Sequence, residues 1–540
     1  MTVQDDIRQL IDAQRERLRL EIPDNREAAI LAIVGVLDRA LVMPGAMREP
    51  DPVTGYRIAN LGGNLALRLC LEADHAAIGP EPLQDVDDWA RRFLVACGDL
   101  AAAELALSHC ESGFMRIVRD AQDSYDAWIA TKQMPASWRE RLDIDWWARS
   151  LPGRGQREME VGRGDQDVFA AVGMPPDAPD GDRAAAHVQG MVWQFPYPTD
   201  AELGGIAIRV WRGVLHTLLD LALQETNRGR RAAPVSARSL AESIASRLGI
   251  ETITVAEAIS GFTLDRETSA WHAAVPGVAT APVIRIGADR IVLSRHGLTT
   301  EPFLFLTHEL RRRDAAAYHN ASYLREVAFR RDLYSLFEDS RFVTSQGRIE
   351  LRGSDRAPRT DIDAAIFDRK TGTLGVFELK SQDPFARSPG ALARQRDNLL
   401  QANRQVSRVL DWLNRNGADE VLNRIDFRTA KRFRVRRVLP FVLGRYLVHF
   451  DGGPEPSRQA AWGAWPQVLR LFTGQPAGPT DSNPLLSLFT YLRKDDAWYQ
   501  MPAGIPSREL ALGDSRLTVH PSYASLQAHG RRIRGGLEAR

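Results

Sequence analysis

The fold of this 540-residue chain is decided by two stretches, Thr360-Asp361-Ile362-Asp363-Ala364-Ala365-Ile366-Phe367 and Leu374-Gly375-Val376-Phe377-Glu378-Leu379-Lys380. Each stretch alternates as a strand does and is rich in apolar residues that suit a buried sheet. The turn between them, Asp368 to Gly372, contains Lys370-Thr371-Gly372. We therefore predict an antiparallel hairpin over residues 361–380.

Charged side chains gather at the open end of this hairpin. Side chains two residues apart share a strand face, so Asp361 lies on the same face as Asp363, and Glu378 on the same face as Lys380. Opposed side chains on paired strands are about 5 Å apart. We therefore expect Asp363 and Glu378 to converge, with Lys380 beside them.

Two carboxylates and a lysine at the end of apolar strands are costly to bury without compensation. A divalent cation supplies it, and Mg²⁺, with Mn²⁺ as the alternative, takes carboxylates, water and substrate phosphate as ligands. Such an ion polarises a phosphodiester and activates a bound water, which an adjacent lysine can orient or deprotonate. The pattern therefore predicts hydrolysis of a nucleic-acid backbone.

The arrangement Asp-x14-Glu-x-Lys resembles the PD-(D/E)XK, or restriction-endonuclease-like, nuclease superfamily. The resemblance implies metal binding by Asp363, Glu378 and the main-chain carbonyl of Leu379, and a catalytic role for Lys380. It also implies a glutamate on the preceding helix and a glutamine on the following helix, for which Glu326 and Gln395 fit, with Gln401 behind.

The sequence leaves open which aspartate binds the metal and whether the Glu-x-Lys pair is functional. The residue before Asp361 is Thr360 where the family pattern has proline, so Asp361 competes with Asp363 for the metal. A Glu-x-Lys pair is also common on the solvated rim of a sheet. A solvated rim needs only a positive charge, which arginine supplies in most of this chain. Lys380 is one of 5 lysines among 70 basic residues, which indicates that a lysine is specifically needed there.

Changes in composition and segments rich in Pro and Gly divide the chain into several units, as its length suggests. We predict a multi-domain α+β protein with an acidic helical region over 1–150, used for sensing, interaction or regulation, and a linker or long loop over 151–190. A mixed α/β region follows over 191–312. We then expect the nuclease-like domain over 313–475, a mixed sheet flanked by helices, and a C-terminal extension with a basic tail over 476–540.

The net charge of +1 hides an asymmetry. Residues 1–130 hold 13 Arg and 22 acidic residues, a net of −9, whereas residues 385–445 hold 14 Lys or Arg and 5 acidic residues, a net of +9. Exposed arginines in the basic part would bind phosphates, although a solvated protein surface explains them equally well. The residues chosen for nucleic-acid binding are Arg394, Arg404, Arg432, Arg434 and Arg436, the last three placed on one face by alternation.

The remaining features narrow the function. The chain contains no GxxxxGK[ST], HExxH or GxSxG motif, and its three cysteines form no CxxC pair. The longest strongly apolar stretch, Leu31 to Leu37, is far shorter than a membrane span. We expect a cytoplasmic Mg²⁺-dependent nuclease with no membrane association that acts on DNA rather than RNA, with defence against phage DNA implied by the resemblance.

Two alternatives accompany this prediction. The first is an inactive nuclease fold that binds nucleic acid or serves as a scaffold. The second concerns the helical N-terminal region, which would bind a protein partner or oligomerise, or would cover the basic cleft until the protein is activated. The −9 and +9 split motivates the covering hypothesis.

Overall fold

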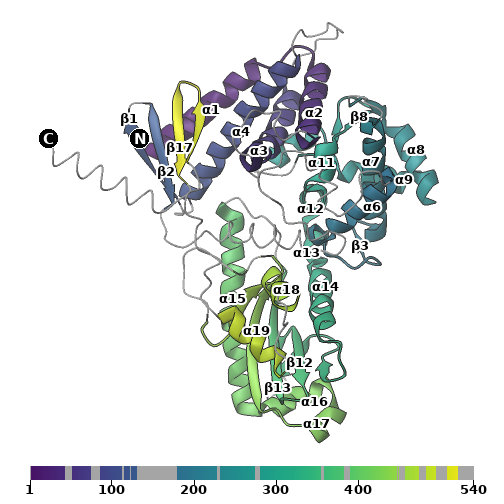
Figure 1. Cartoon of the computed structure of the whole chain (residues 1–540), viewed down its shortest axis with the longest axis vertical. Helices are drawn as coiled ribbons and strands as arrows, with labels where there is room; N and C mark the ends of the chain where they lie inside the picture. Colours follow the sequence, from purple (N-terminus) through teal and green to yellow (C-terminus); the bar gives the residue numbers. More distant parts are fainter. Residues whose placement is uncertain are drawn as a thin grey trace, which may run out of the picture.

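The computed structural model describes residues 2–42, 52–73, 86–111, 115–121, 123–129, 179–227, 232–273, 280–353, 358–381, 389–446, 448, 457–473, 482–493 and 507–520. The chain is a mixed α+β protein, as predicted, with helices and several sheets. Figure 1 shows the N-terminal helices at one end of the long axis and a sheet-containing unit, residues 322–493, at the other. Most of the predicted linker and the basic tail lie outside the described residues.

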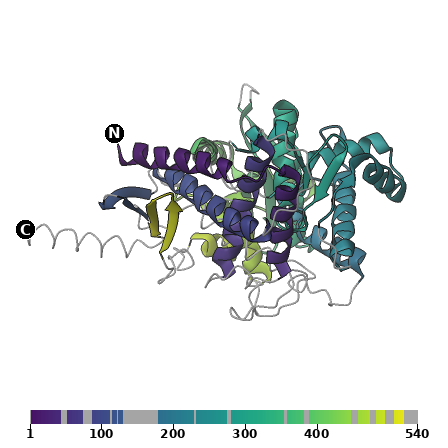
Figure 2. The ribbon, with the colours of Figure 1, turned by 90° about the horizontal axis from the view of Figure 1, so that it is seen from above.

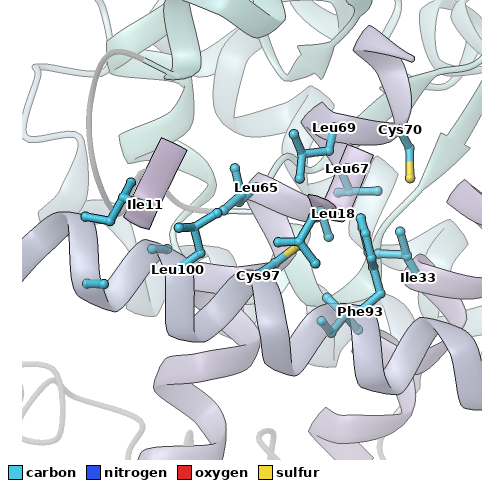
Figure 3. Close-up of a cluster of buried hydrophobic side chains, with 14 of the residues drawn as sticks. Ile11, Leu18, Ile33, Leu65, Leu67, Leu69, Cys70, Phe93, Cys97 and Leu100 are labelled. Atoms are coloured by element: carbon cyan, nitrogen blue, oxygen red, sulfur yellow. The ribbon is translucent and has the colours of Figure 1, made fainter. Parts of the chain in front are cut away.

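Four helices build the N-terminal unit: α1 (Val3–Leu20), α2 (Arg26–Val42), α3 (Pro52–Glu72) and α4 (Val86–Glu111). α4 packs against the other three and contributes Phe93, Cys97 and Leu100 to the core drawn in Figure 3. α3 approaches α4 closely at Gly62, where a Cβ atom would lie 2.5 Å from the main-chain oxygen of Leu94. Cys70, Cys97 and Cys110 are all free and buried in this unit.

α4 is also the helix that, among the described residues, has the length and composition to cross a membrane. Its most apolar 18-residue window is 67% buried inside the structure. α4 contacts the other three N-terminal helices and also a strand from the C-terminal part of the chain, and Figure 2, which looks along the long axis, shows the yellow C-terminal strands beside the N-terminal helices. A core helix of a folded unit has the same composition, and α4 occupies such a position.

A four-stranded sheet closes the N-terminal unit and corrects one prediction. The sequence predicted an acidic helical region over 1–150, in which residues 85–132 are rich in Ala and Leu, but α4 ends at Glu111 and strands follow it. The order of the sheet is β1 (Met115–Ala121), β2 (Ser124–Ile129), β17 (Ser515–His520) and β16 (Arg508–Leu512). β17 pairs in parallel with β2, and that distant partner buries Ile117, Tyr125 and Leu517 against the helices. Tertiary pairing therefore overrides the local Ala- and Leu-rich helical signal.

The middle region is helical around a small sheet. Its helices are α6 (Asp180–Gly190), α7 (Ile208–Asn227), α8 (Ala237–Leu248), α9 (Thr252–Gly261), α10 (Arg266–Ala273), α11 (Arg295–Thr299), α12 (Pro302–Arg313) and α13 (Ala315–Asn320), with a 3-10 turn at Val192–Gln194. The sheet order is β5 (Val235–Ser236), β8 (Arg290–Leu293), β7 (Val283–Arg285) and β6 (Thr263–Leu264), and β3 (Glu202–Leu203) pairs with β4 (Ile206–Ala207). β7 and β8 pair antiparallel as a hairpin.

The middle region and the N-terminal unit share a core. Ile284, Val292 and Phe305 pack in the same buried cluster as the residues of α1 to α4. At the surface of this contact, Arg290 pairs with both carboxylate oxygens of Glu27, at 2.6 and 2.8 Å. The two regions therefore behave as one packed body.

The C-terminal unit is built on a five-stranded mixed sheet of order β15 (Ala461–Ala464), β14 (Arg437–Gly444), β13 (Thr373–Lys380), β12 (Ala364–Asp368) and β9 (Phe342–Thr344). The predicted hairpin is confirmed, since β12 and β13 are antiparallel, whereas β14 runs parallel to both β13 and β15. A separate two-stranded ribbon joins β10 (Ile349–Arg352) to β11 (Pro358–Ile362).

Helices cover both faces of this sheet. One face packs against α14 (Ser322–Tyr334), the 3-10 turn at Ser335–Phe337, α18 (Trp465–Thr473) and α19 (Pro484–Arg493). The other face packs against α15 (Pro389–Asn416), α16 (Ala418–Ile425) and α17 (Phe427–Arg432). The burial of both faces explains why β12 and β13 read as nearly continuous apolar runs in the sequence.

Candidate active site

The candidate site forms where β11 leaves the hairpin. Asp363 is the last residue to pair with β13 before the chain turns aside: its main-chain N–H donates to the carbonyl of Phe377 at 3.1 Å, while Ile362 and Asp361 pair with β10 instead. The next N–H on β13, that of Leu379, donates to Oδ2 of Asp363 at 2.8 Å. The Asp363 carboxylate therefore satisfies a main-chain donor at the position where the two strands diverge.

Asp363 and Glu378 face each other, as predicted. The register pairs Ala364 with Phe377, which puts Asp363 directly opposite Glu378 and on the face of the sheet that α15 covers. Both residues are buried, each with 6% of its surface exposed. Burial and the neighbouring charge of Asp363 together raise the pKa of Glu378 to about 8, against the lowering effect of Lys380. The pKa of Asp363 is also raised by burial, against the lowering effect of the Leu379 N–H.

Lys380 lies beside this pair. Its Nζ is 2.6 Å from Oε1 of Glu378 and donates a 3.0 Å hydrogen bond to Oε1 of Gln405, on α15. The Lys380 side chain keeps 19% of its surface exposed, so the ammonium is the most accessible of the three predicted groups. A small pocket between α15 and the sheet reaches the same end of the hairpin and is lined by Glu378, Asp361, Val406 and Val409, among others.

Glu326 approaches from the opposite face. It lies half-buried on α14, and burial together with the charge of Asp363 raises its pKa, while the charge of Lys380 lowers it. One turn further along α14, Nε of Arg330 donates to the main-chain carbonyl of Asp363 at 2.5 Å. α14 therefore places one acidic and one basic side chain at the same end of the sheet.

Asp361 lies close enough to Asp363 for its charge to raise the pKa of that carboxyl group, but it has an ion-pair partner of its own. Oδ2 of Asp361 pairs with Nε of Arg348 at 2.5 Å, across the β10–β11 ribbon, so its charge already has a partner. Asp363 instead faces Glu378 directly. The geometry favours Asp363 as the metal-binding aspartate, although Asp361 borders the pocket next to it.

A glutamine of the same helix other than the predicted Gln395 contacts Lys380. Gln395 is buried near the start of α15, and ten residues, or about 15 Å of helix, separate it from Gln405. Gln405 is the residue that bonds Lys380. It lies one turn after Gln401, the second glutamine that the sequence offered. The helical period therefore predicted which face of the helix carries the glutamine, but not which turn of the helix reaches Lys380.

The predicted basic residues divide into two groups. Arg404 is exposed and adjacent to Gln405 on α15, close to the site, and Arg394 is exposed in the first turns of the same helix. Arg432, Arg434 and Arg436 are exposed at the other end of the sheet, because β14 begins at Arg437, opposite Thr373 rather than opposite Lys380. The expectation that these three lie on one strand face is wrong: α17 ends at Arg432, and an extended connection carries the other two.

The donor set fits one mode of Mg²⁺ binding. The Leu379 N–H engages Oδ2 of Asp363 and the Lys380 ammonium engages Oε1 of Glu378, which leaves a second oxygen on each carboxylate. Among the residues that the structure describes, no group of three or more His, Cys, Asp or Glu side chains is arranged to hold a metal ion. The residues thus fit an ion held by two carboxylates, with water and substrate phosphate completing its shell, and not an all-protein cage.

Comparison with known proteins adds no relative: no family model, no curated protein and no solved structure matches this chain.

Proposed function

We propose that this protein is a metal-dependent nuclease that hydrolyses phosphodiester bonds of DNA, with the active site at Asp363, Glu378 and Lys380. The observation that carries the proposal is the convergence of two buried carboxylates and one lysine at the end of adjacent strands. Their raised carboxyl pKa values show that the pair is poorly stabilised when both groups are charged and lack a further cation. This constellation, with Glu326 on the preceding helix, also supports a restriction-endonuclease-like assignment for the C-terminal sheet.

Each residue has a distinct task in this proposal. Asp363 and Glu378, with the carbonyl of Leu379, would hold Mg²⁺ or Mn²⁺, which when bound polarises the phosphate and lowers the pKa of a water ligand. Lys380 places a positive charge where negative charge develops on the phosphate oxygens, and Gln405 holds its ammonium in position. Arg404, which is exposed next to Gln405 in the sequence, would contact the backbone of the substrate.

The cellular location and the biological role are further parts of the proposal. The free, buried state of the three cysteines is what a reducing cytoplasm would give. A role in defence against foreign DNA rests on the family resemblance and stays a prediction. Within the basic segment over 385–445, α17 lies at the opposite end of the long axis from α1 to α4 (Figure 1), whereas α15 contacts α4. Covering of the basic cleft by the acidic N-terminal region therefore stays a prediction.

The test is incubation of the full chain with linear, circular and single-stranded DNA and with RNA, in Mg²⁺, in Mn²⁺ and in EDTA. We expect cleavage of DNA that EDTA abolishes and that Lys380→Ala lowers at least about 100-fold, in line with the loss of a charge-stabilising catalytic group. Lys370→Ala, in the turn at the far end of the hairpin, is the matched control and should cleave normally.

The outcomes separate the alternatives. Cleavage that persists in EDTA or in Lys380→Ala would refute the mechanism. DNA binding with no cleavage under any metal would instead identify an inactive nuclease fold that serves as a binding protein.

A further inference from the structure

A second charged surface lies at the other end of the sheet. It consists of six exposed cations, which we call the distal basic patch: Arg428, Lys431, Arg432, Arg434, Arg436 and Arg437. No acidic residue occurs between the first and the last of them. Within the described part of the chain, Arg434 forms an ion pair, with Asp419 at 3.8 Å, and the other five have no ion pair within 4 Å. The patch is therefore a concentration of largely uncompensated positive charge.

The backbone beneath the patch is well fixed. Asp426 caps α17 by accepting hydrogen bonds from the main-chain N–H groups of Arg428 and Thr429. Thr429 and Ala430 are buried on the inner side of that helix. The N–H groups of Arg436 and Arg437 then donate to the carbonyl of Gly372, at 2.8 and 3.3 Å. Six like charges on a fixed backbone repel one another, and a polyanion relieves that repulsion.

The distance between the patch and the candidate active site follows from the register. β13 and β14 run side by side from Thr373 and Arg437 at one end to Lys380 and Gly444 at the other. Seven residues at about 3.3 Å each separate these ends by about 23 Å. Along the axis of duplex DNA, which rises about 3.4 Å per base pair, this distance corresponds to about seven base pairs.

We propose that the distal basic patch binds the phosphate backbone of the same nucleic-acid molecule that the active site holds, so that the protein grips its substrate at two points about 23 Å apart. This inference rests on the proposed function, because it takes the substrate of that site as its ligand. It adds a length requirement: a duplex of fewer than about seven base pairs reaches one of the two points, and a longer one reaches both. Binding at both points multiplies the two affinities through a high effective concentration.

The test measures DNA binding and cleavage separately, with the full chain throughout. Binding uses Lys380→Ala protein in Mg²⁺, with labelled duplexes of about 6 and about 20 base pairs, lengths chosen on either side of the seven-base-pair span. We expect the longer duplex to bind about 100-fold more tightly, the low end of the gain from two linked contacts. Adding Arg434→Glu and Arg436→Glu should reduce that ratio below about 10 and lower the slope of log Kd against log salt by about 2, one unit per lost phosphate contact.

The matched control adds Arg92→Glu and Arg116→Glu instead, two exposed arginines of the N-terminal unit that give the same change in net charge. Its length ratio should equal that of the Lys380→Ala protein. A ratio unchanged in the patch variant, or lowered equally in the control, would overturn the proposal.

Cleavage distinguishes this inference from the proposed function. With Lys380 intact, the patch variant should lose kcat/KM about 10-fold on the long duplex, which corresponds to about 1.4 kcal/mol, and little on the short one. If no variant cleaves DNA but the length ratio behaves as expected, the two-point grip stands and the nuclease assignment falls. If DNA is cleaved but binding does not depend on the length of the duplex, the nuclease assignment stands and the two-point grip falls.

Discussion

Lys380 and Gln405 are joined by a 3.0 Å hydrogen bond, although they belong to different elements and lie 25 residues apart. The amide oxygen of Gln405 accepts from the ammonium that also pairs with Glu378. α15 thus fixes the position of the one flexible group in the site. A lysine side chain has four rotatable bonds, and holding its head group in place is a separate requirement from supplying it.

We predict that Gln405→Leu lowers kcat about 10-fold or more while DNA binding changes less than about 2-fold, because the substitution removes the positioning of Lys380 and not its charge. Gln405→Glu should restore part of the rate, since a carboxylate also accepts from the ammonium. Single-turnover cleavage and binding by the same variants measure the two effects.

Gln401→Leu is the control for this prediction, because Gln401 is exposed one turn earlier on the same helix. A loss of activity equal to that of Gln405→Leu would show that the helix surface, and not the bond to Lys380, is what matters.

The two aspartates of the hairpin make a second prediction. Asp363→Asn should abolish metal-dependent cleavage and weaken Mg²⁺ binding measured by calorimetry at least about 10-fold, because it removes one of the two facing carboxylates. Asp361→Asn should retain most of the activity, since Asp361 is paired with Arg348. The opposite ranking would assign the metal to Asp361.

The local parts of this architecture were predictable from the sequence. The hairpin of β12 and β13, the helices α14 and α15 and the facing of Asp363 and Glu378 all follow from alternation, helical period and a turn. Each depends on residues close together in the chain, where side-chain direction is set by the backbone.

The remaining parts depend on long-range pairing. The strand β2 was predicted as helix because its partner, β17, lies almost 400 residues away, and no local pattern encodes a parallel pairing over that distance. The choice of Gln405 over Gln395 likewise depends on where α15 crosses the sheet. Arg434 and Arg436 precede β14, so their position depends on whether β14 runs parallel or antiparallel to β13. The sequence does not specify that direction.

A third prediction concerns pH. Asp38, on α2, accepts a hydrogen bond from the N–H of His296 on α11 at 2.9 Å, and burial raises its pKa from 3.8 to about 6, against the lowering effect of the His296 and Arg295 N–H groups. Because the folded-state pKa is the higher one, the stabilisation from protonating Asp38 is complete below about pH 4 and is lost as the pH rises through about 6.

Asp38→Asn should therefore raise the free energy of unfolding at neutral pH by up to about 3 kcal/mol, the value of roughly two pKa units, and should have little effect near pH 4. Thermal melting of the wild type and the variant at both pH values measures this. Asp88→Asn, at an exposed carboxyl group on α4, should change neither. A variant less stable at neutral pH would show that the charged form is favoured in this interface.

The last prediction tests the packing of the N-terminal helices. At Gly62 of α3, a Cβ atom would lie 2.5 Å from the Leu94 oxygen and 2.8 Å from the Gly98 nitrogen, both rigid main-chain atoms of α4. Gly62→Ala must push the helices apart, and we expect a loss of about 1–3 kcal/mol, as for overpacked cores. Gly35→Ala on α2 is the control: its Cβ would meet a flexible arginine tip at 3.6 Å, so the gain in helix propensity should stabilise the protein by up to about 1 kcal/mol. Denaturant unfolding followed by circular dichroism measures both, and equal effects of the two substitutions would contradict the close contact between α3 and α4.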